Sequence, residues 1–308
     1  ICRYQSFKTE EEFRKALMDK SQHKIDVGPV YTVDPQKRAA YSGGSEGRVF
    51  APQERELVFD IDMTDYGDLY PEVQSYSEES CSRHWVLMNA AVKVVNDVLR
   101  EDFGFEHILW VFSGRRGVHA WVCDHKARHL TDEQRTSVVE FFNIFKGAKT
   151  NEQGIRKALL TNPLHPSYER ASRILEEYWV EKILPEFGLL DHPEQLQRLL
   201  SMIPDPETRD KVHDRLKRIR SEDAAKEKWE ALKDVVKKAV KGKQGRIAYE
   251  LARTPSEILF SYVFPRLDLE VTKHMNHLLK APFCVHPKTG KVKEAKLKPA
   301  LLIHSTLD

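Results

Sequence analysis

Two apolar segments joined by a short turn constrain the fold of this chain more than any other part of the sequence. Residues 107–124 read HILWVFSGRRGVHAWVCD, so aromatic and β-branched residues stand on both sides of Ser-Gly-Arg-Arg-Gly. Such residues favour extended backbone, and glycine allows a sharp bend between them. The segment therefore predicts two adjacent strands joined by a tight turn, and a β-sheet as part of the fold.

Further strands and helices are expected on both sides of this pair. The predicted strands cover residues 2–7, 24–31, 54–63 and 264–271, and the predicted helices cover residues 9–18, 85–103, 131–145 and 271–280. Residues 150–240 are mostly helical in pattern and highly charged. Strands toward both ends with a helical block between them favour an α+β fold. We expect a core of residues 1–149 and 247–308, with residues 150–246 inserted as a helical subdomain.

Charge and hydropathy bound the classes of protein to which the chain can belong. Lys and Arg total 49 against 47 Asp and Glu, a net charge of +2, so composition alone does not indicate nucleic-acid binding. A basic face can still exist locally, because binding follows the placement of charge. The sequence contains no run of about 18 apolar residues, so no membrane-spanning helix is predicted. No membrane partner is expected. No signal peptide is visible, and because the chain begins with Ile1 we expect the natural N-terminus to lie upstream.

Two carboxylates at the end of a strand form the sharpest chemical signal. Residues 54–63 read ERELVFDIDM, with Asp60 and Asp62 after an apolar run. Because side chains at i and i+2 of a strand share a face, both carboxylates are expected to point the same way. Their repulsion is costly unless a cation lies between them, and such oxygen ligands suit Mg²⁺ or Mn²⁺. One capping Asp and one solvated Asp remain the alternative, because Asp-x-Asp is a common pattern.

The turn between the two strands is the second signal. It reads SGRRGVH over residues 113–119, which places Arg115 and Arg116 between two glycines and His119 at the start of the next strand. Adjacent guanidinium groups match phosphate oxygens, and the flanking glycines let a phosphate approach the backbone closely. An exposed hairpin with two solvated arginines is the alternative, and the glycines favour the anion site.

A third signal lies late in the chain. Arg266-Leu267-Asp268 stands on a predicted strand, and Lys280 and His286 follow it. A third carboxylate would complete a metal site, and the two basic residues would add positive charge for a triphosphate. Each of these residues is unremarkable alone, and only their combination indicates a site.

In combination these segments resemble the small catalytic subunit of archaeal and eukaryotic primases. The resemblance rests on ELVFDIDMTDY, SGRRGVHAWVCD, FPRLDLEV and NHLLKAPFCVHPKTG, which follow the order of the family's motifs at compatible spacings. RYQSF and KIDVGPVY near the start are also similar. The similarity runs from residue 1 to about residue 293, is weak through the helical block and is closest to the eukaryotic members.

The resemblance implies both a fold and a set of site residues. The implied fold is a mixed β-sheet primase core flanked by helices, with the helical subdomain inserted. The implied metal site holds two Mg²⁺ or Mn²⁺ ions through the catalytic residues Asp60, Asp62 and Asp268. The residues implied to bind the incoming nucleoside triphosphate are Ser113, Arg115, Arg116, His119, Lys280 and His286. Arg3 also matches a basic residue of the family's site, and Asp26 matches a sugar-contact position.

One stretch departs from the family pattern. Family members usually carry a zinc-binding cluster, mostly of Cys, between the Asp-x-Asp strand and the next helix. Residues 67–85 read GDLYPEVQSYSEESCSRHW and offer only Cys81 and His84, in Cys-x-x-His spacing. A structural Zn²⁺ normally needs four ligands, so two more would have to come from nearby acids or from elsewhere in the fold.

The function that the resemblance implies is synthesis of short RNA primers de novo on single-stranded DNA, for the initiation of replication. Our mechanistic hypothesis is two-metal nucleotidyl transfer, in which one metal activates a ribose 3′-hydroxyl and the other stabilises the leaving pyrophosphate. Basic side chains would neutralise the phosphates. The implied partners are the DNA template, nucleoside triphosphates, a primase large subunit in a heterodimer and the DNA polymerase alpha complex, and the implied location is the nucleus.

Three other functions stay open at this point. A primase-polymerase or repair polymerase of the same superfamily would prefer deoxynucleotides, which a comparison of NTP and dNTP incorporation would reveal. A glycosyltransferase also uses Asp-x-Asp with Mn²⁺, but it would not need the arginine turn or a distant third Asp. A non-catalytic nucleic-acid-binding scaffold subunit would keep DNA binding after loss of all three carboxylates.

Overall fold

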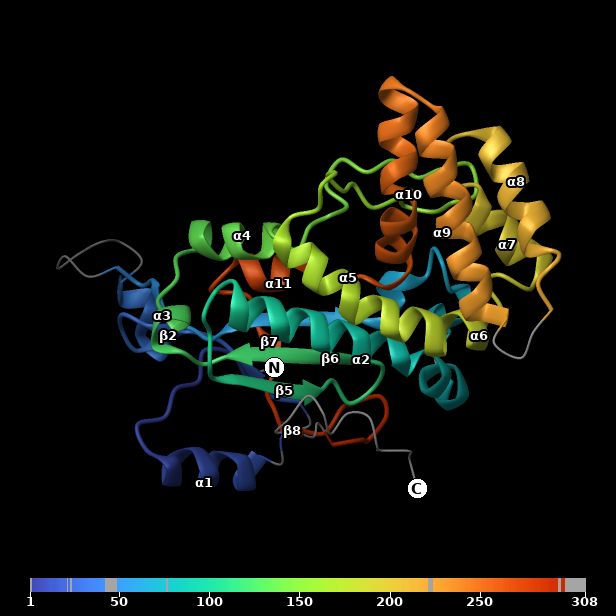
Figure 1. Cartoon of the computed structure of the whole chain (residues 1–308). Coiled ribbons are helices and arrows are strands. Elements are labelled where there is room, and N and C mark those ends of the chain that lie inside the picture. Colours follow the sequence, from blue (N-terminus) through green and yellow to red (C-terminus); the bar gives the residue numbers. More distant parts are fainter. Residues whose placement is uncertain are drawn as a thin grey trace. The chain divides into compact units, whose positions relative to one another are not determined.

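The computed structural model describes residues 2–20, 22, 24–41, 49–75, 77–220, 224–292 and 295–296. It combines helices with antiparallel sheets, so the expected α+β class is confirmed (Figure 1). The chain divides into two compact units. The sheet unit comprises Ile1–Asp60, Phe105–Phe141 and Leu267–Asp308, and the helical unit comprises Ile61–Gly104 and Phe142–Arg266. A domain division at residues 150 and 246 stays a prediction.

A four-stranded sheet organises the sheet unit. Its strand order is β4 (Leu57–Asp62), β6 (Gly117–Val122), β5 (Ile108–Phe112) and β8 (Ala295–Lys296). Strands β5 and β6 pair antiparallel with Val111 opposite His119, which confirms the predicted pair of strands and its turn. The order places β4, with its two aspartates, beside the strand that begins with the arginine turn.

Smaller elements complete the sheet unit. Two short antiparallel pairs are β1 (Asp26–Val27) with β7 (Leu279–Lys280), and β2 (Val30–Tyr31) with β3 (Pro52–Glu54). The α-helices are α1 (Glu10–Lys20), α3 (His125–Arg128), α4 (Asp132–Glu140) and α11 (Leu269–Lys273), and a 3-10 helix covers Pro35–Tyr41. A buried apolar cluster holds strands to α11 and consists of Val58, Val111, Trp121, Val271 and Leu279.

Two buried arginines fix the chain just before β4. Arg135 of α4 is fully buried and donates hydrogen bonds to the carbonyl oxygens of Arg55, at 2.6 Å, and Glu56, at 3.0 Å. Arg55 is also buried and donates to the carbonyl oxygen of His274 at 3.0 Å. Burial lowers the pKa of each guanidinium to about 10, so both stay charged at neutral pH. These bonds tie the entry of β4 to α4 and to the segment after α11.

The helical unit packs long helices around an aromatic core. Its α-helices are α2 (Glu78–Glu101), α5 (Pro166–Tyr178), α6 (Leu184–Phe187), α7 (Pro193–Leu200), α8 (Pro206–Leu216), α9 (Ala224–Gly242) and α10 (Gly245–Val263). Short 3-10 helices cover Met63–Tyr66 and Pro71–Gln74, and a π-helix covers Trp179–Ile183. The Trp179 ring lies 5.6 Å from that of Trp229 and 5.4 Å from that of Tyr262, centroid to centroid. No helix in the described part of the chain is long and apolar enough to cross a membrane.

Two of the predicted strands are wrong. Residues 264–271 form a loop that leads into α11, because the Asp268 side chain accepts a hydrogen bond from the Glu270 amide and so caps that helix. Residues 2–7 form no strand, and Tyr4 adopts a φ of 57°, which extended backbone excludes. Local hydrogen bonding overrides the alternation of FPRLDLEV, and the left-handed conformation of Tyr4 interrupts residues 2–7.

Candidate active site

The two aspartates of β4 occupy the partly exposed positions of a buried strand. Phe59 and Ile61 are fully buried, whereas Asp60 and Asp62 are half-buried. The alternation of burial along β4 therefore puts both carboxylates on one face of the strand, as their spacing predicts.

Asp268 is joined to β4 through the backbone, although 207 positions separate it from Asp60. Its amide donates to the carbonyl oxygen of Asp60 at 3.0 Å. One turn later the Thr272 hydroxyl donates to the carbonyl oxygen of Val58 at 2.8 Å. These two bonds hold the start of α11 alongside β4, so the backbones of Asp268 and Asp60 are neighbours.

Each of the three carboxylates also has a partner within the protein. Asp60 Oδ1 lies 3.4 Å from His119 Nε2, and this histidine is almost fully buried. Asp62 Oδ1 accepts hydrogen bonds from the Thr64 amide and hydroxyl, at 2.9 and 2.7 Å. Asp268 Oδ1 accepts from the Glu270 amide at 3.1 Å. The carboxylates are thus oriented individually and do not converge on one point.

The donor set nevertheless fits a hard divalent cation. Carboxylate oxygens are the ligands that Mg²⁺ and Mn²⁺ prefer, and the backbone bond between Asp60 and Asp268 places these two residues next to each other. Within the described ranges, no three His, Cys, Asp or Glu side chains stand close enough together to hold a metal ion. Binding would therefore require these side chains to turn away from His119 and from their capping bonds.

The turn between β5 and β6 is closed by its own hydrogen bonds. The Ser113 amide donates to the carbonyl oxygen of Gly117 at 2.8 Å, and the Gly117 amide donates to Ser113 Oγ at 3.0 Å. Gly114 adopts a φ of 85°, a conformation that favours glycine. Arg115 and Arg116 are half-buried on this turn. Two guanidinium groups are therefore held on a short loop with a fixed backbone.

The segment that contains His286 packs directly against this turn. His286 is buried, and the Thr289 hydroxyl donates to the carbonyl oxygen of Gly114 at 2.6 Å. The His286 amide donates to the carbonyl oxygen of Lys291 at 2.8 Å, which folds residues 286–291 into a tight loop. The structure thus brings His286 and the arginine turn together. Sequence reasoning had missed Thr289, whose signal is the turn-forming HPKTG run.

A methyl group at Gly114 is expected to disturb this contact. A Cβ there would lie 2.6 Å from the Cβ of His286, and alanine strains the left-handed backbone. We expect Gly114→Ala to lower the free energy of unfolding by about 2–4 kcal/mol and to weaken ATP binding. Thermal melting and titration with ATP would measure both effects.

Gly290→Ala is the matched control for this variant. Gly290 also has a positive φ, of 69°, but a Cβ there would meet nothing within 4 Å. Gly290→Ala should therefore lower the free energy of unfolding only through backbone strain, by about 1 kcal/mol. Equal losses in the two variants would contradict a specific contact between Gly114 and His286.

Lys280 and Asp26 face each other across a strand pair. They are register partners in β7 and β1, and the Ala281 amide donates to the carbonyl oxygen of Ile25 at 2.9 Å. Asp26 also forms an ion pair with Lys24 at 2.9 Å. These two predicted site residues are therefore neighbours.

Arg3 lies in an aromatic environment. It is exposed, and its guanidinium carbon lies 5.4 Å from the Tyr4 ring centroid. Burial raises the pKa of Tyr31, and the nearby Arg3 opposes that shift. Arg3 is thus placed beside Tyr4 and Tyr31, and its role at a phosphate stays a prediction.

Cys81 and His84 lie in the first turns of α2, within the helical unit. His84 Nδ1 donates to the carbonyl oxygen of Ser80 at 2.8 Å, and its buried ring lies near the rings of Tyr70 and Phe187. Burial lowers the pKa of His84. Cys81 is half-buried. A Zn²⁺ ion at Cys81 and His84 stays a prediction.

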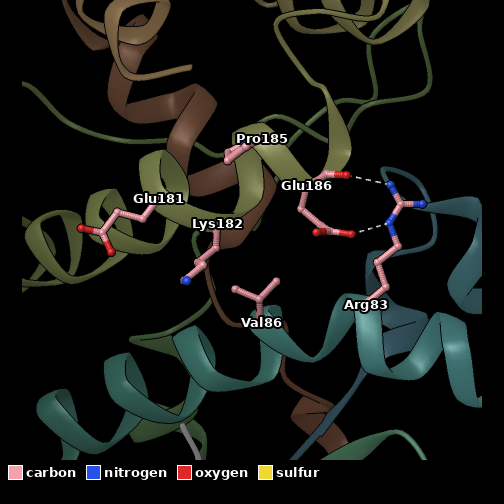
Figure 2. Close-up of a pocket in the computed structure, with 6 residues that line it drawn as sticks. All are labelled: Arg83, Val86, Glu181, Lys182, Pro185 and Glu186. Carbon is pink, nitrogen blue, oxygen red and sulfur yellow. Dashed lines mark hydrogen bonds and ion pairs between the residues drawn. The ribbon is translucent and has the colours of Figure 1, made fainter. Parts of the chain in front are cut away.

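Two cavities in the described part of the helical unit are lined by residues other than the predicted site residues. One, of about 470 Å³, is lined by α2 and by residues 181–186 (Figure 2). At its edge the Arg83 guanidinium donates to Glu186 Oε1 at 3.0 Å and to the Glu186 carbonyl oxygen at 2.7 Å. A larger cavity of about 1500 Å³ is lined mainly by α7, α8 and the start of α9. Neither cavity gathers carboxylates with an arginine turn.

Comparison with known proteins identifies the family. Residues 59–294 match the family model for the DNA primase small subunit. The DNA primase small subunit of Drosophila melanogaster is 38% identical, with 94% of this chain and 65% of that protein covered. The Schizosaccharomyces pombe and Saccharomyces cerevisiae proteins of the same name are 36% and 35% identical, with 94% of this chain covered in each case.

The matched segment contains the three aspartates, the arginine turn and the segment from Lys280 to His286. The chain spans 65%, 62% and 69% of the length of these three relatives. The chain belongs to the DNA primase small subunit family.

Proposed function

We propose that this chain is the catalytic part of a DNA primase, which synthesises short RNA primers de novo on single-stranded DNA. One observation carries the proposal. His119, two residues after the arginine turn, lies 3.4 Å from Asp60, and the Asp268 amide bonds the backbone of Asp60. A carboxylate suited to a divalent cation therefore adjoins the strand that follows the arginine turn. This pairing is the arrangement that nucleotidyl transfer from a triphosphate requires.

The side chains of the arginine turn would bind the triphosphate. Arg115 and Arg116 offer planar donors on a loop that is already closed, so little rearrangement opposes binding. His119 and His286 are held in place by burial, and Lys280 adds positive charge from β7. Neutralisation of phosphate charge during transfer is the main contribution of these groups.

Asp60, Asp62 and Asp268 would hold Mg²⁺ or Mn²⁺. When bound, such ions would supply activation of a ribose 3′-hydroxyl and stabilisation of the pyrophosphate. Asp60 and Asp62 stand on a strand whose neighbour carries the arginine turn, and the amide of Asp268 bonds the backbone of that strand. The three carboxylates would therefore position the acceptor and the nucleotide relative to each other.

The position of Asp26 supports a preference for ribonucleotides over deoxyribonucleotides. It stands opposite Lys280 in the β1–β7 pair, so a sugar beside the triphosphate would meet a carboxylate able to accept a hydrogen bond from a 2′-hydroxyl. The competing function is a primase-polymerase that prefers deoxynucleotides. Incorporation of ATP and dATP on the same template separates the two, and we expect Asp26→Ala to reduce the preference for ATP.

The whole protein is further proposed to work with other subunits in the nucleus. A primase large subunit would form a heterodimer with this protein, and the DNA polymerase alpha complex would extend the primers. The support is membership of a family whose eukaryotic relatives are named as small subunits.

Primer synthesis on poly(dT) with labelled ATP tests the proposed activity. We expect short RNA products with Mg²⁺ or Mn²⁺, none after chelation by EDTA, and recovery when Mg²⁺ is restored. The assay should also be run with a longer form of the protein and with the large subunit. Absence of products under all these conditions, at high ATP and with Mn²⁺, would contradict the proposal and favour a non-catalytic subunit.

A further inference from the structure

Exposed apolar side chains gather on the segment that follows Lys280. Phe283, Val285 and Val292 expose 63%, 48% and 48% of their surfaces. Val285 and Val292 are paired in an antiparallel bridge, so their side chains are cross-strand neighbours. A single exposed apolar residue is ordinary, whereas a cluster on one short segment indicates a surface that contacts something else.

Phe283 has a strained backbone conformation, which raises the free energy of the folded state. Its φ is 64°, in the left-handed region that costs a bulky residue on the order of 1–2 kcal/mol. Its ring remains in solvent, so burial does not offset this cost. A strained backbone that presents an aromatic ring to solvent points to a contact outside the chain.

The same segment is strongly basic although the chain as a whole is nearly neutral. Residues 280–292 read KAPFCVHPKTGKV, with three Lys and no Asp or Glu. Lys288 is exposed and Lys291 is half-buried. Aromatic rings beside cationic groups are the combination by which proteins bind single-stranded nucleic acids, because bases stack on the rings and phosphates contact the cations.

The segment adjoins the arginine turn on one side only. His286 is buried against Gly114, whereas its neighbour Val285 is exposed. Because successive side chains of an extended segment point to opposite sides, Val285 and its partner Val292 face away from the turn. A triphosphate held by Arg115 and Arg116 therefore lies on the His286 side, which leaves the apolar side for a different ligand.

We propose that Phe283, Val285 and Val292 form a stacking surface for a base of the single-stranded DNA template. Lys288, which is exposed, contacts a phosphate of the same strand. The proposal rests on the proposed primase function and adds to it a template contact next to the nucleotide site. Charge selects DNA as the ligand, because residues 280–292 contain three lysines, with Lys288 exposed, and no acidic residue.

Binding of fluorescein-labelled oligo(dT) to the 308-residue chain, without metal or nucleotide, tests this contact. The key variant is Phe283→Asn, because asparagine tolerates the left-handed backbone and so removes the ring without adding strain. We expect its Kd to rise at least about fivefold, the effect of losing one stacked base. Phe283→Trp should keep the native Kd.

Two further variants sharpen the test. Phe13→Ala removes another partly exposed phenylalanine, on α1, and should leave the Kd unchanged. The variant Lys288→Gln should reduce the slope of log Kd against log salt by about 0.7, the contribution of one phosphate contact on a single strand. Thermal melting of every variant would verify that it is folded.

The outcomes separate this contact from the enzymatic activity. Weaker DNA binding by Phe283→Asn supports the contact, even if the native chain makes no primers. Unchanged DNA binding by Phe283→Asn, in a chain that does make primers, overturns the contact and leaves the activity standing. A native chain that does not bind oligo(dT) also overturns it. So does a change in oligomeric mass of Phe283→Asn with an unchanged Kd, which would indicate a protein-binding surface.

Discussion

Replacement of Asp60 by alanine is expected to reduce primer synthesis at least about 10³-fold. Asp60 contributes a carboxylate to the proposed metal donor set, and the loss of several kcal/mol of transition-state stabilisation corresponds to about this factor. Folding should change little, because the side chain is half-buried and its backbone bond to the Asp268 amide remains. The measurement is the rate of RNA synthesis on poly(dT) with saturating ATP and Mn²⁺.

The variant needs a control that removes an equal charge elsewhere. Asp19→Ala, at an exposed position of α1, should retain native activity. The free energy of unfolding of both variants should lie within about 1 kcal/mol of the native value, as is usual for surface changes. If Asp60→Ala kept a third or more of the native rate, the carboxylates of β4 would have no part in the chemistry.

Arg135→Met is expected to lower the free energy of unfolding by about 3 kcal/mol or more. The substitution keeps an unbranched side chain in place but removes the guanidinium, which bonds the carbonyl oxygens of Arg55, Glu56 and Leu130. Those oxygens would be left without their charged donor, and such losses cost about 1.5–3 kcal/mol each when the donor is charged. Urea unfolding measures the total.

Hydrogen exchange would locate the effect of this substitution. Protection should fall in β4 and α4, because Arg135 joins these two elements, while α9 and α10 should keep their native protection. Glu133→Met changes an exposed residue of the same helix and should have little effect on stability. A loss below about 1 kcal/mol for Arg135→Met would mean that other donors serve these carbonyl groups.

The parts of the site that depend on local sequence were predictable. The apolar runs and their glycines determine the β5–β6 turn, and alternation determines the face shared by Asp60 and Asp62. The residues that meet from distant parts of the chain were assembled only through the family resemblance. No periodicity relates Asp268 to Asp60, because their contact is a backbone hydrogen bond between segments that lie far apart in the sequence.

The errors of prediction have equally specific causes. FPRLDLEV alternates like a strand, but Asp268 caps a helix and Arg266 is held in the helical unit by Asp68 and by the carbonyl oxygen of Asp65. The burial of Arg135 could not be predicted, since an arginine in a charged helix is usually solvated. Its buried guanidinium bonds carbonyl oxygens of the residues just before β4 and of α3, and these meet only in the folded structure.

The order of segments along the chain has a consequence for the protein as it is made on a ribosome. The sheet unit is built from three stretches, and the last of them, Leu267–Asp308, follows the whole helical unit in the sequence. This last stretch carries Asp268, Lys280 and His286. A nascent chain that has already formed β4, β5 and β6 therefore lacks one of the three aspartates, and two of the six residues proposed to bind the triphosphate, until this stretch has been translated. A premature stop near residue 265 would therefore leave a chain without Asp268, Lys280 and His286, and so without part of the proposed site.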